Sequence, residues 1–398
     1  MTTVADLTAT IERLWPDASE VVLSEVGDPL PLPVGDVEHY RAVPSLRSPR
    51  LVVPVERAAA SNAMRRFSSS VSAREVVERL GIATIVRFAG TGRFGSVVVV
   101  DPGAGITAHL SDVLGQDVVV SLGIGSERAN RKPVLQVFGR SGRPIAHVKV
   151  GDTDVAAGHV RGEADALRSI AGHRWDRVRV PELVHHGTWR GMEILAMSSL
   201  SASPWQVGRR RRFPSGAMAE VAATAEEGAV ELAATPAWTR WSATAATLVD
   251  PMMSERLRAA MRAVEDRHGS AIVRCGAWHG DFAPWNMAWS DRRLSLWDWE
   301  RYETGVPVGL DAVHYAVNVR IRAAGFVVPA VRSGLADAEG LLGAGAPVAA
   351  LCESYLVGIA ARYLAAAEGA GGDVILGSGV AALDVLDLMV GTSGRTPT

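Results

Sequence analysis

The amino-acid sequence predicts an α+β fold in which an antiparallel β-rich region is followed by a mainly helical region. Three apolar, strand-like runs between residues 117 and 150 are joined by turn-rich connectors, which is the pattern of an antiparallel meander. After residue 215 the chain consists largely of Ala-rich segments with helical character. The residues before the meander mix short helical and strand-like runs, which predicts an extra α/β region in front. We therefore expect an N-terminal extension over 1–114, a β-rich lobe over 115–200 and a helical lobe over 201–398.

In the N-terminal extension, residues 3–15 place apolar side chains at helical spacing, which predicts an amphipathic helix. Two strand-like runs, VVLSEV and LVVPV, follow between Pro and Gly residues. The segment SAREVVERL has helical character, and we expect two strands after it, IATIVRF and SVVVVD, on either side of GTGRFG. No motif in residues 1–114 indicates a role for this region.

In the β-rich lobe the expected strands are DVVVSLG, PVLQVFG and IAHVKV, and a helix is expected at HVRGEADALRSI. In the helical lobe, two short strands around residues 285–299 interrupt four segments that we expect to be helices. These segments are AMAEVAATAEEGAVELAA, MSERLRAAMRAVEDRHG, VGLDAVHYAVNVRIRAA and PVAALCESYLVGIAARYLAAAEG.

The composition disfavours several classes of protein. The 398 residues include 41 basic and 43 acidic side chains, so no global field attracts nucleic acid or an anionic membrane. Two cysteines are too few for a disulfide framework or a thiolate metal site, which favours a reducing compartment. The first residues do not follow the pattern of a secretion signal, and no run of about 18 uncharged apolar residues occurs. We expect a cytoplasmic protein that partners neither membrane nor nucleic acid.

The strongest local feature is the segment HGDFAPWN at 279–286, which precedes an Asp at the end of a short apolar run. Asp281, if it lies on a loop, can accept the proton of an attacking hydroxyl, and Asn286, five residues later, can reach a divalent metal ion. Asp298 can hold the metal ions that bridge the phosphates of a nucleotide. These are the groups that phosphoryl transfer requires.

With these residues the chain resembles the aminoglycoside phosphotransferase family, a branch of the protein-kinase-like fold that includes many small-molecule kinases. H-G-D-x-x-x-x-N and the downstream D-W-E both match, and the resemblance covers roughly residues 115–390. It implies a two-lobed kinase-like fold with ATP and Mg²⁺ as cofactors. It also implies Asp281 as catalytic base, Asn286 and Asp298 as Mg²⁺ ligands, and His279 as a residue that braces the loop.

One of only two lysines in the chain, Lys149, lies in the middle of an apolar strand, where a charge is costly unless it is paired. Glu163, in the first turn of the following helix, is suitably placed to form the ion pair that positions the α- and β-phosphates in this fold. The alternative is a lysine on an edge strand that points into solvent.

Two glycine-rich segments compete to cover the phosphates. GTGRFGSV at 90–97 fits the protein-kinase pattern G-x-G-x-x-G-x-V, but it lies too far before Lys149 for a direct three-strand connection. The segment 123–132 is closer, and one strand fits between it and the lysine, so we favour it. This choice makes Gly123, Gly125 and Ser126 nucleotide-binding residues, with Arg128 and Lys132 as hypothetical phosphate contacts. GTGRFG is then an ordinary turn whose glycines supply positive φ.

Three further predictions follow from the resemblance. The segment 192–200, with Met197, occupies the place of the hinge whose backbone groups bind the nucleotide base; the alternative is a plain buried strand. Asp311 resembles the structural acid near a helix start in this family. Glu300 and Tyr302 are candidates for the lining of the acceptor pocket.

Two differences from the protein-kinase sequence pattern limit the functions that we expect for this chain. Gly280 stands where eukaryotic-type protein kinases carry an Arg that pairs with a phosphorylated activation segment, and the stretch from Asp298 to about Leu310 is too short for such a segment. We therefore expect an ATP-dependent phosphotransferase that acts on a hydroxyl of a small molecule, such as a sugar, an aminoglycoside or another metabolite. Two alternatives remain open: Ser/Thr phosphorylation of a natural-product precursor peptide, and a catalytically silent nucleotide-binding scaffold. The mildly acidic residues 301–398 neither support nor exclude an aminoglycoside.

Overall fold

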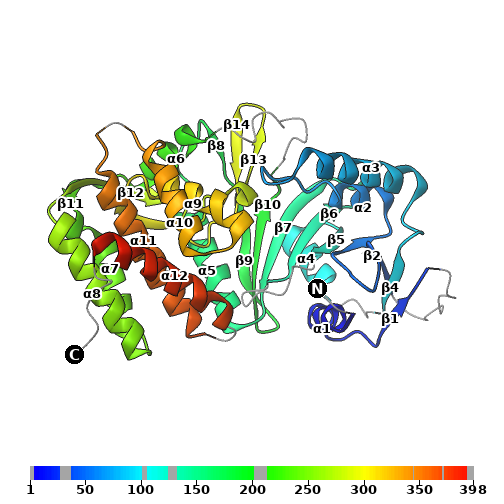
Figure 1. The fold of residues 1–398 in the computed structure, drawn as a ribbon. Helices are drawn as coiled ribbons and strands as arrows, with labels where there is room; N and C mark the ends of the chain where they lie inside the picture. The colour runs from blue at the N-terminus through cyan, green and yellow to red at the C-terminus, as the bar shows by residue number, and fades with distance from the viewer. Residues whose placement is uncertain are drawn as a thin grey trace. The chain divides into compact units, whose positions relative to one another are not determined.

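The computed structural model describes residues 4–26, 37–100, 105–123, 132–200, 213–343, 345–369 and 372–391. These residues form two compact units, which we describe one at a time (Figure 1). Unit 1 comprises Met1–Phe67, Val71–Ala164 and Pro181–Pro204, and unit 2 comprises Ser68–Ser70, Asp165–Val180 and Trp205–Thr398.

Unit 1 is built on one nine-stranded sheet with the strand order β1-β4-β2-β3-β5-β6-β7-β10-β9, in which every pair of neighbours is antiparallel. The strands are β1 (Glu20–Ser24), β2 (Val37–Val43), β3 (Leu51–Pro54), β4 (Gly95–Val100), β5 (Val118–Gly123), β6 (Val134–Gly139), β7 (Pro144–Gly151), β9 (Leu183–Trp189) and β10 (Met192–Ser198). The helices of this part of the chain are α1 (Val4–Leu14), α2 (Arg57–Ala63), α3 (Ala73–Ala89), α4 (Ile106–Leu114) and α5 (Asp154–Ile170).

The meander expected between residues 117 and 150 is present as β5, β6 and β7. The N-terminal extension joins it directly, because β3 pairs with β5 through Leu51 and Val52. The extension and the β-rich lobe therefore share one sheet. Helices α1 and α4 pack on one face of this sheet, where Leu7, Ile11 and Leu14 of α1 are buried in its main core. Helices α2 and α3 contribute to a second, smaller core that includes Phe138.

The expectation of a strand at IATIVRF is wrong, because these residues continue α3. The helix begins at a complete capping box, in which the Ser72 hydroxyl accepts from Glu75 N–H and the Glu75 carboxylate accepts from Ser72 N–H. It ends at Gly90, whose φ of +80° closes the last turn. GTGRFG thus connects a helix to β4 and does not lie between two strands.

Unit 2 is mainly helical and contains two small sheets, with strand orders β11-β12-β15 and β13-β14-β8. Its helices are α6 (Ser215–Ala222), α7 (Pro236–Thr247), α8 (Pro251–His268), α9 (Leu310–Ala324), α10 (Val328–Glu339), α11 (Val348–Ala367) and α12 (Asp373–Val390). Its strands are β8 (Val178–Arg179), β11 (Gly228–Glu231), β12 (Ile272–Trp278), β13 (Met287–Ser290), β14 (Arg293–Leu296) and β15 (Glu303–Pro307). The α+β class predicted from the sequence is confirmed by these two units.

Of the four segments expected to be helices in this unit, the first is only partly helical. Helix α6 ends at Ala222, and β11 follows at Gly228. The positive φ of Gly228, +92°, favours a turn at this point over a continued helix. Within the described residues α11 alone is long and apolar enough to cross a membrane, and 72% of its apolar window is buried inside the structure. Its residues form the centre of the unit 2 core, together with α7, α8, α9 and α12.

Candidate active site

The loop that carries Asp281 follows β12 in unit 2 and turns sharply at Gly280. Gly280 has a φ of +74°, and a Cβ atom at this position would lie 2.1 Å from the carbonyl oxygen of Arg301. Both the left-handed backbone and the close approach require glycine. This geometry accounts for a glycine where the protein-kinase pattern has arginine.

Asp311, in the first turn of α9, holds this loop from behind. Its carboxylate accepts the backbone N–H groups of His279, at 2.8 Å, and of Gly280, at 3.2 Å. Burial raises the pKa of Asp311 to about 7, although the two N–H groups and the charge of Arg362 act in the opposite direction. Asp311 therefore acts as a structural acid in this loop, as the sequence suggested.

His279 braces the loop through both ring nitrogens. Its Nδ1 accepts the Asp281 N–H at 3.3 Å, and its Nε2 lies 3.2 Å from the carbonyl oxygen of Trp297, to which an Nε2–H can donate. Burial lowers the pKa of His279 to about 4, so the imidazole is neutral at pH 7. The ring also packs edge-on against buried Trp299, with the centroids 4.7 Å apart. His279 thus ties the Asp281 loop to the segment that carries Asp298.

The carboxylate of Asp281 is held at both oxygens. Asn286 donates from Nδ2 to Oδ2 at 2.7 Å and to the Asp281 backbone oxygen at 3.1 Å. On the other side, Nε2 of His314 lies 3.1 Å from Oδ1. Burial raises the pKa of Asp281, but the hydrogen bond and charge of His314 outweigh this effect, and the net direction is downward. The side chain keeps 31% of its surface exposed, so an ionised, oriented carboxylate remains accessible.

Three residues around Asp281 were missed in the sequence, because their positions in it show no motif. His314 lies one turn after Asp311 on α9, and its Nδ1 is 3.2 Å from the hydroxyl of Tyr355 on α11. Arg362, also on α11, donates to the Gly280 carbonyl oxygen at 2.7 Å and stacks over Trp278. A helical spacing of three from Asp311 is the only signal that could have pointed to His314.

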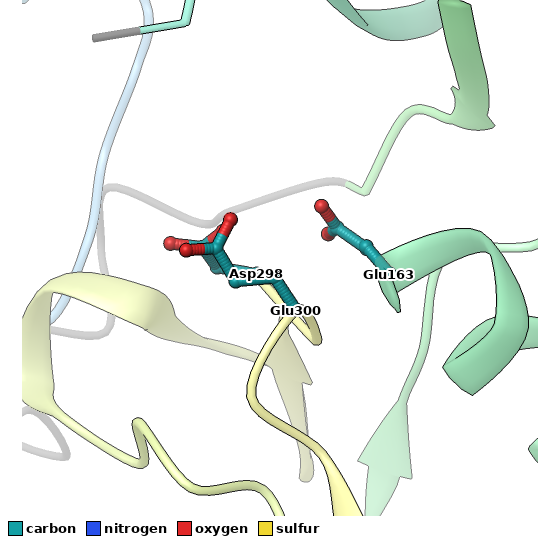
Figure 2. Close-up of side chains that lie close together, drawn as sticks. All are labelled: Glu163, Asp298 and Glu300. Carbon is teal, nitrogen blue, oxygen red and sulfur yellow. The ribbon is translucent and has the colours of Figure 1, made fainter. Parts of the chain in front are cut away.

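Asp298 and Glu300 follow β14 and lie side by side in unit 2, with carboxylate oxygens within 4.8 Å of each other (Figure 2). Asp298 has a φ of +72°, a conformation that Asp tolerates better than most residues. Between them, Trp299 is completely buried and donates from its indole N–H to the Leu296 carbonyl oxygen. Carboxylate oxygens such as these two are ligands that Mg²⁺ prefers.

The other predicted site residues belong to unit 1. Lys149 on β7 pairs with Glu163 on α5 at 2.5 Å, and their side chains are 12% and 0% exposed. The ion pair expected from the sequence is therefore present, and the alternative of a solvent-exposed edge lysine is wrong. Glu163 is also drawn in Figure 2. Gly125, Ser126 and Arg128 lie outside the described residues.

Strand register places Lys149 and several other residues on one face of the unit 1 sheet. Gly123, Val134, Lys149 and Leu195 are successive cross-strand partners, and so are Ser121, Gln136, His147 and Met197. Cross-strand partners and residues two apart share a face of a sheet. Gly123, Lys149 and Met197 are thus on the same face. The opposite face is apolar and belongs to the main core of unit 1.

No family model and no curated protein matches the chain. Several solved structures are similar to it in fold. A thermostable mutant of aminoglycoside phosphotransferase APH(4)-Ia, in complex with ADP and hygromycin B, is 13% identical, with a TM-score of 0.49 and coverage of 73% of this chain and 99% of that one. Spectinomycin phosphotransferase APH(9)-Ia, with ADP and spectinomycin, is 9% identical, with a TM-score of 0.42 and coverage of 71% and 97%.

A putative fructosamine-3-kinase from Haemophilus somnus 129PT is 10% identical, with a TM-score of 0.40 and coverage of 73% and 97%. At these identities the similarity concerns the fold, and it assigns neither an activity nor a substrate to this chain.

Proposed function

We propose that this chain is an ATP-dependent phosphotransferase that moves the γ-phosphate of ATP to a hydroxyl of a small molecule. The observation that carries the proposal is the arrangement around Asp281. An accessible carboxylate with a lowered pKa is fixed at both oxygens by Asn286 and His314, on a loop anchored by Asp311. A loop built to hold one carboxylate in one orientation suits a general base.

In the proposed reaction Asp281 orients the acceptor hydroxyl and receives its proton. The hydroxyl oxygen forms a bond to the γ-phosphorus, and the bond from that phosphorus to the β–γ bridging oxygen breaks, which releases ADP. The downward pKa shift keeps the Asp281 carboxylate ionised before the reaction. The proton then leaves Asp281 with the phosphorylated product or through solvent.

Asn286 and Asp298 are the proposed Mg²⁺ ligands, with Glu300 as a further nearby carboxylate. When bound, Mg²⁺ neutralises the charge of the phosphates in phosphoryl transfer. The Asn286 amide nitrogen donates to Asp281, which leaves its oxygen as the atom that can face a cation. The same side chain can therefore position the base and hold the metal.

Unit 1 is proposed to bind the nucleotide. Lys149 anchors the phosphates, and Glu163 positions the Lys149 ammonium group through their ion pair. Gly123 is proposed to lie near the phosphates and Met197 near the base, since register places both on the face of Lys149. Gly125 and Ser126 complete the proposed phosphate-binding segment.

The similar structures bear on the substrate class. The similar phosphotransferases were crystallised with ADP or AMP-PNP as the nucleotide and with hygromycin B or spectinomycin as the second ligand. We infer a small-molecule acceptor for this chain and a cytoplasmic location. A peptide acceptor is less favoured, because Gly280 replaces the arginine that switchable protein kinases use. A side chain does not fit at residue 280, since its Cβ atom would lie 2.1 Å from the carbonyl oxygen of Arg301.

The test is transfer to a panel of acceptors with Mg²⁺ and ATP: sugars, aminoglycosides, nucleosides, amino alcohols and a Ser/Thr peptide, with product masses read directly. We expect one acceptor class to gain the mass of one phosphate, and Asp281→Ala to abolish the gain. Asp266→Ala, an exposed carboxylate on α8, is the matched control and should transfer normally. A gain on the peptide alone would replace the small-molecule proposal, and nucleotide binding without any transfer would favour a silent scaffold.

A further inference from the structure

Arg66 connects the N-terminal extension to the face of the unit 1 sheet that carries Lys149. It follows α2, and its backbone oxygen accepts a hydrogen bond from the Arg79 side chain on α3. A Cβ atom at Gly123 would lie 3.0 Å from Nη1 of Arg66, so the guanidinium lies directly against the end of β5. The missing side chain at Gly123 leaves the space that this guanidinium occupies.

The positive charges of Arg66 and Lys149 both affect the pKa of His147. Burial, together with the positive charges of Arg66 and Lys149, lowers the pKa of His147 to about 4. His147 and Lys149 are two apart on β7 and share a face. Two cations from distant parts of the chain therefore act on the same imidazole, which places both near one region of the sheet.

Arg66 differs from Lys149 in its partners. Lys149 is paired with Glu163, whereas no described residue makes an ion pair or a side-chain hydrogen bond with Arg66. Surrounding protein atoms and the positive charge of Arg79 lower the pKa of Arg66, although its side chain is accessible to solvent. The two positive charges repel each other, and an anion bound at Arg66 would relieve this repulsion.

A second, independent observation concerns Gln136, on the same face. Its side chain is 4% exposed, and its Nε2 donor makes no hydrogen bond within the described part of the chain. An unsatisfied buried amide is costly in a folded protein and calls for an explanation. Gln136 is the cross-strand partner of both His147 and Ser121, so register places it beside the imidazole on which the two cations act. A ligand with acceptor oxygens would satisfy it.

We propose that Arg66 is a phosphate-binding residue of the nucleotide site, so that the N-terminal extension supplies part of that site. This inference rests on the proposed function, because the phosphates in question are those of ATP. The planar guanidinium binds phosphate oxygens in a bidentate manner, whereas Lys149 supplies a point charge. The inference gives a role to a region whose sequence contains no motif.

The experiment compares the binding of three probes, ATP with Mg²⁺, ADP with Mg²⁺ and adenosine, by titration calorimetry on the full chain. The variants are Arg66→Gln, Arg66→Lys and, as matched control, Arg65→Gln, whose side chain is the exposed neighbour. We expect Arg66→Gln to raise the Kd for ATP about 10- to 100-fold, the range for a lost hydrogen bond to a charged group. Adenosine binding should be unchanged, and Arg65→Gln should bind all three probes as the wild type does.

The outcomes separate this inference from the proposed function. If Arg66→Gln binds ATP with wild-type affinity, the inference is overturned and the proposed function stands. The same holds if the affinities for ATP and adenosine fall equally, because Arg66 then has a structural role. Failure of the wild type to bind ATP overturns both. If Arg66→Gln does not fold, the Arg66→Lys variant is used in its place. The inference requires that Arg66→Lys binds ATP more weakly than the wild type and binds adenosine equally well. Wild-type ATP affinity in Arg66→Lys contradicts the inference.

Discussion

Replacing Asp311 by Asn should destabilise the loop that carries Asp281. Both carboxylate oxygens of Asp311 accept backbone N–H groups, and the residue is 4% exposed. Asn has one oxygen, so Asp311→Asn leaves one N–H facing an NH₂ group, and these two buried donors, the backbone N–H and the new NH₂, have no acceptor. At about 1–3 kcal/mol for each unsatisfied donor, the free energy of unfolding should fall by about 2–6 kcal/mol at pH 8, where the Asp311 carboxyl is ionised and both of its oxygens accept.

The same substitution has a pH signature. Because burial raises the pKa of folded Asp311 to about 7, above the ordinary 3.8, the folded state keeps a proton that the unfolded state has lost. The stability that Asp311 contributes is therefore fully present below about pH 4 and is lost as the pH rises to about 7. Each pH unit in this window corresponds to about 1.4 kcal/mol. The deficit of Asp311→Asn relative to the wild type should thus be larger at pH 5 than at pH 8.

The assay is urea unfolding at pH 5 and pH 8, followed by tryptophan fluorescence, since Trp278 and Trp299 are buried beside this loop. Asp266→Asn, on the exposed side of α8, is the control and should change stability by no more than about 0.5 kcal/mol. An Asp311→Asn protein as stable as the wild type at both values of pH would contradict the role of Asp311 as the acceptor that holds this loop. Equal deficits at pH 5 and pH 8 would refute the assigned direction of the pKa.

Two further predictions concern the groups that position the reactants. His314→Ala should lower kcat about tenfold or more with little change in the KM for ATP, because Asp281 loses the hydrogen bond at Oδ1; equal changes in both constants would contradict this role. Glu163→Gln should destabilise the chain by about 3–5 kcal/mol and weaken ATP binding, because it removes the negative charge that Glu163 places beside the largely buried Lys149 ammonium group; a thermal melt and a nucleotide titration check both effects, and an unchanged melting temperature would contradict the first.

The sequence was sufficient to predict those features that depend on residues close together in the chain. The meander β5–β7, the hairpin β13–β14 and the Lys149–Glu163 ion pair all follow from short-range patterns. A charged side chain in an apolar strand needs a partner, and the following helix offers one within a few turns. The structural role of Asp311 was expected from the family resemblance, whereas the two N–H groups that it accepts became known only from the structure.

Contacts between residues far apart in the chain could not be predicted from local patterns. The pairing of β3 with β5 joins the N-terminal extension to the meander across about 70 residues, and no local pattern encodes such a pairing. The apolar run at 82–88 favours a strand by composition, yet the capping box at Ser72 starts a helix that runs through it. Exposed Val77 and Phe88 also blur the helical periodicity of α3. His314 reaches Asp281 only because α9 returns beside the loop.

The most direct test of the central claim separates catalysis from binding in Asp281→Asn. With the acceptor found in the panel, kcat and the Kd for Mg²⁺-ATP are measured on the same preparations of wild type and variant. Loss of a general base should lower kcat about 10²- to 10⁴-fold while the nucleotide Kd stays within about threefold. A variant that transfers phosphate at the wild-type rate would contradict the assignment of Asp281 as the base, and with it the proposed reaction at this loop.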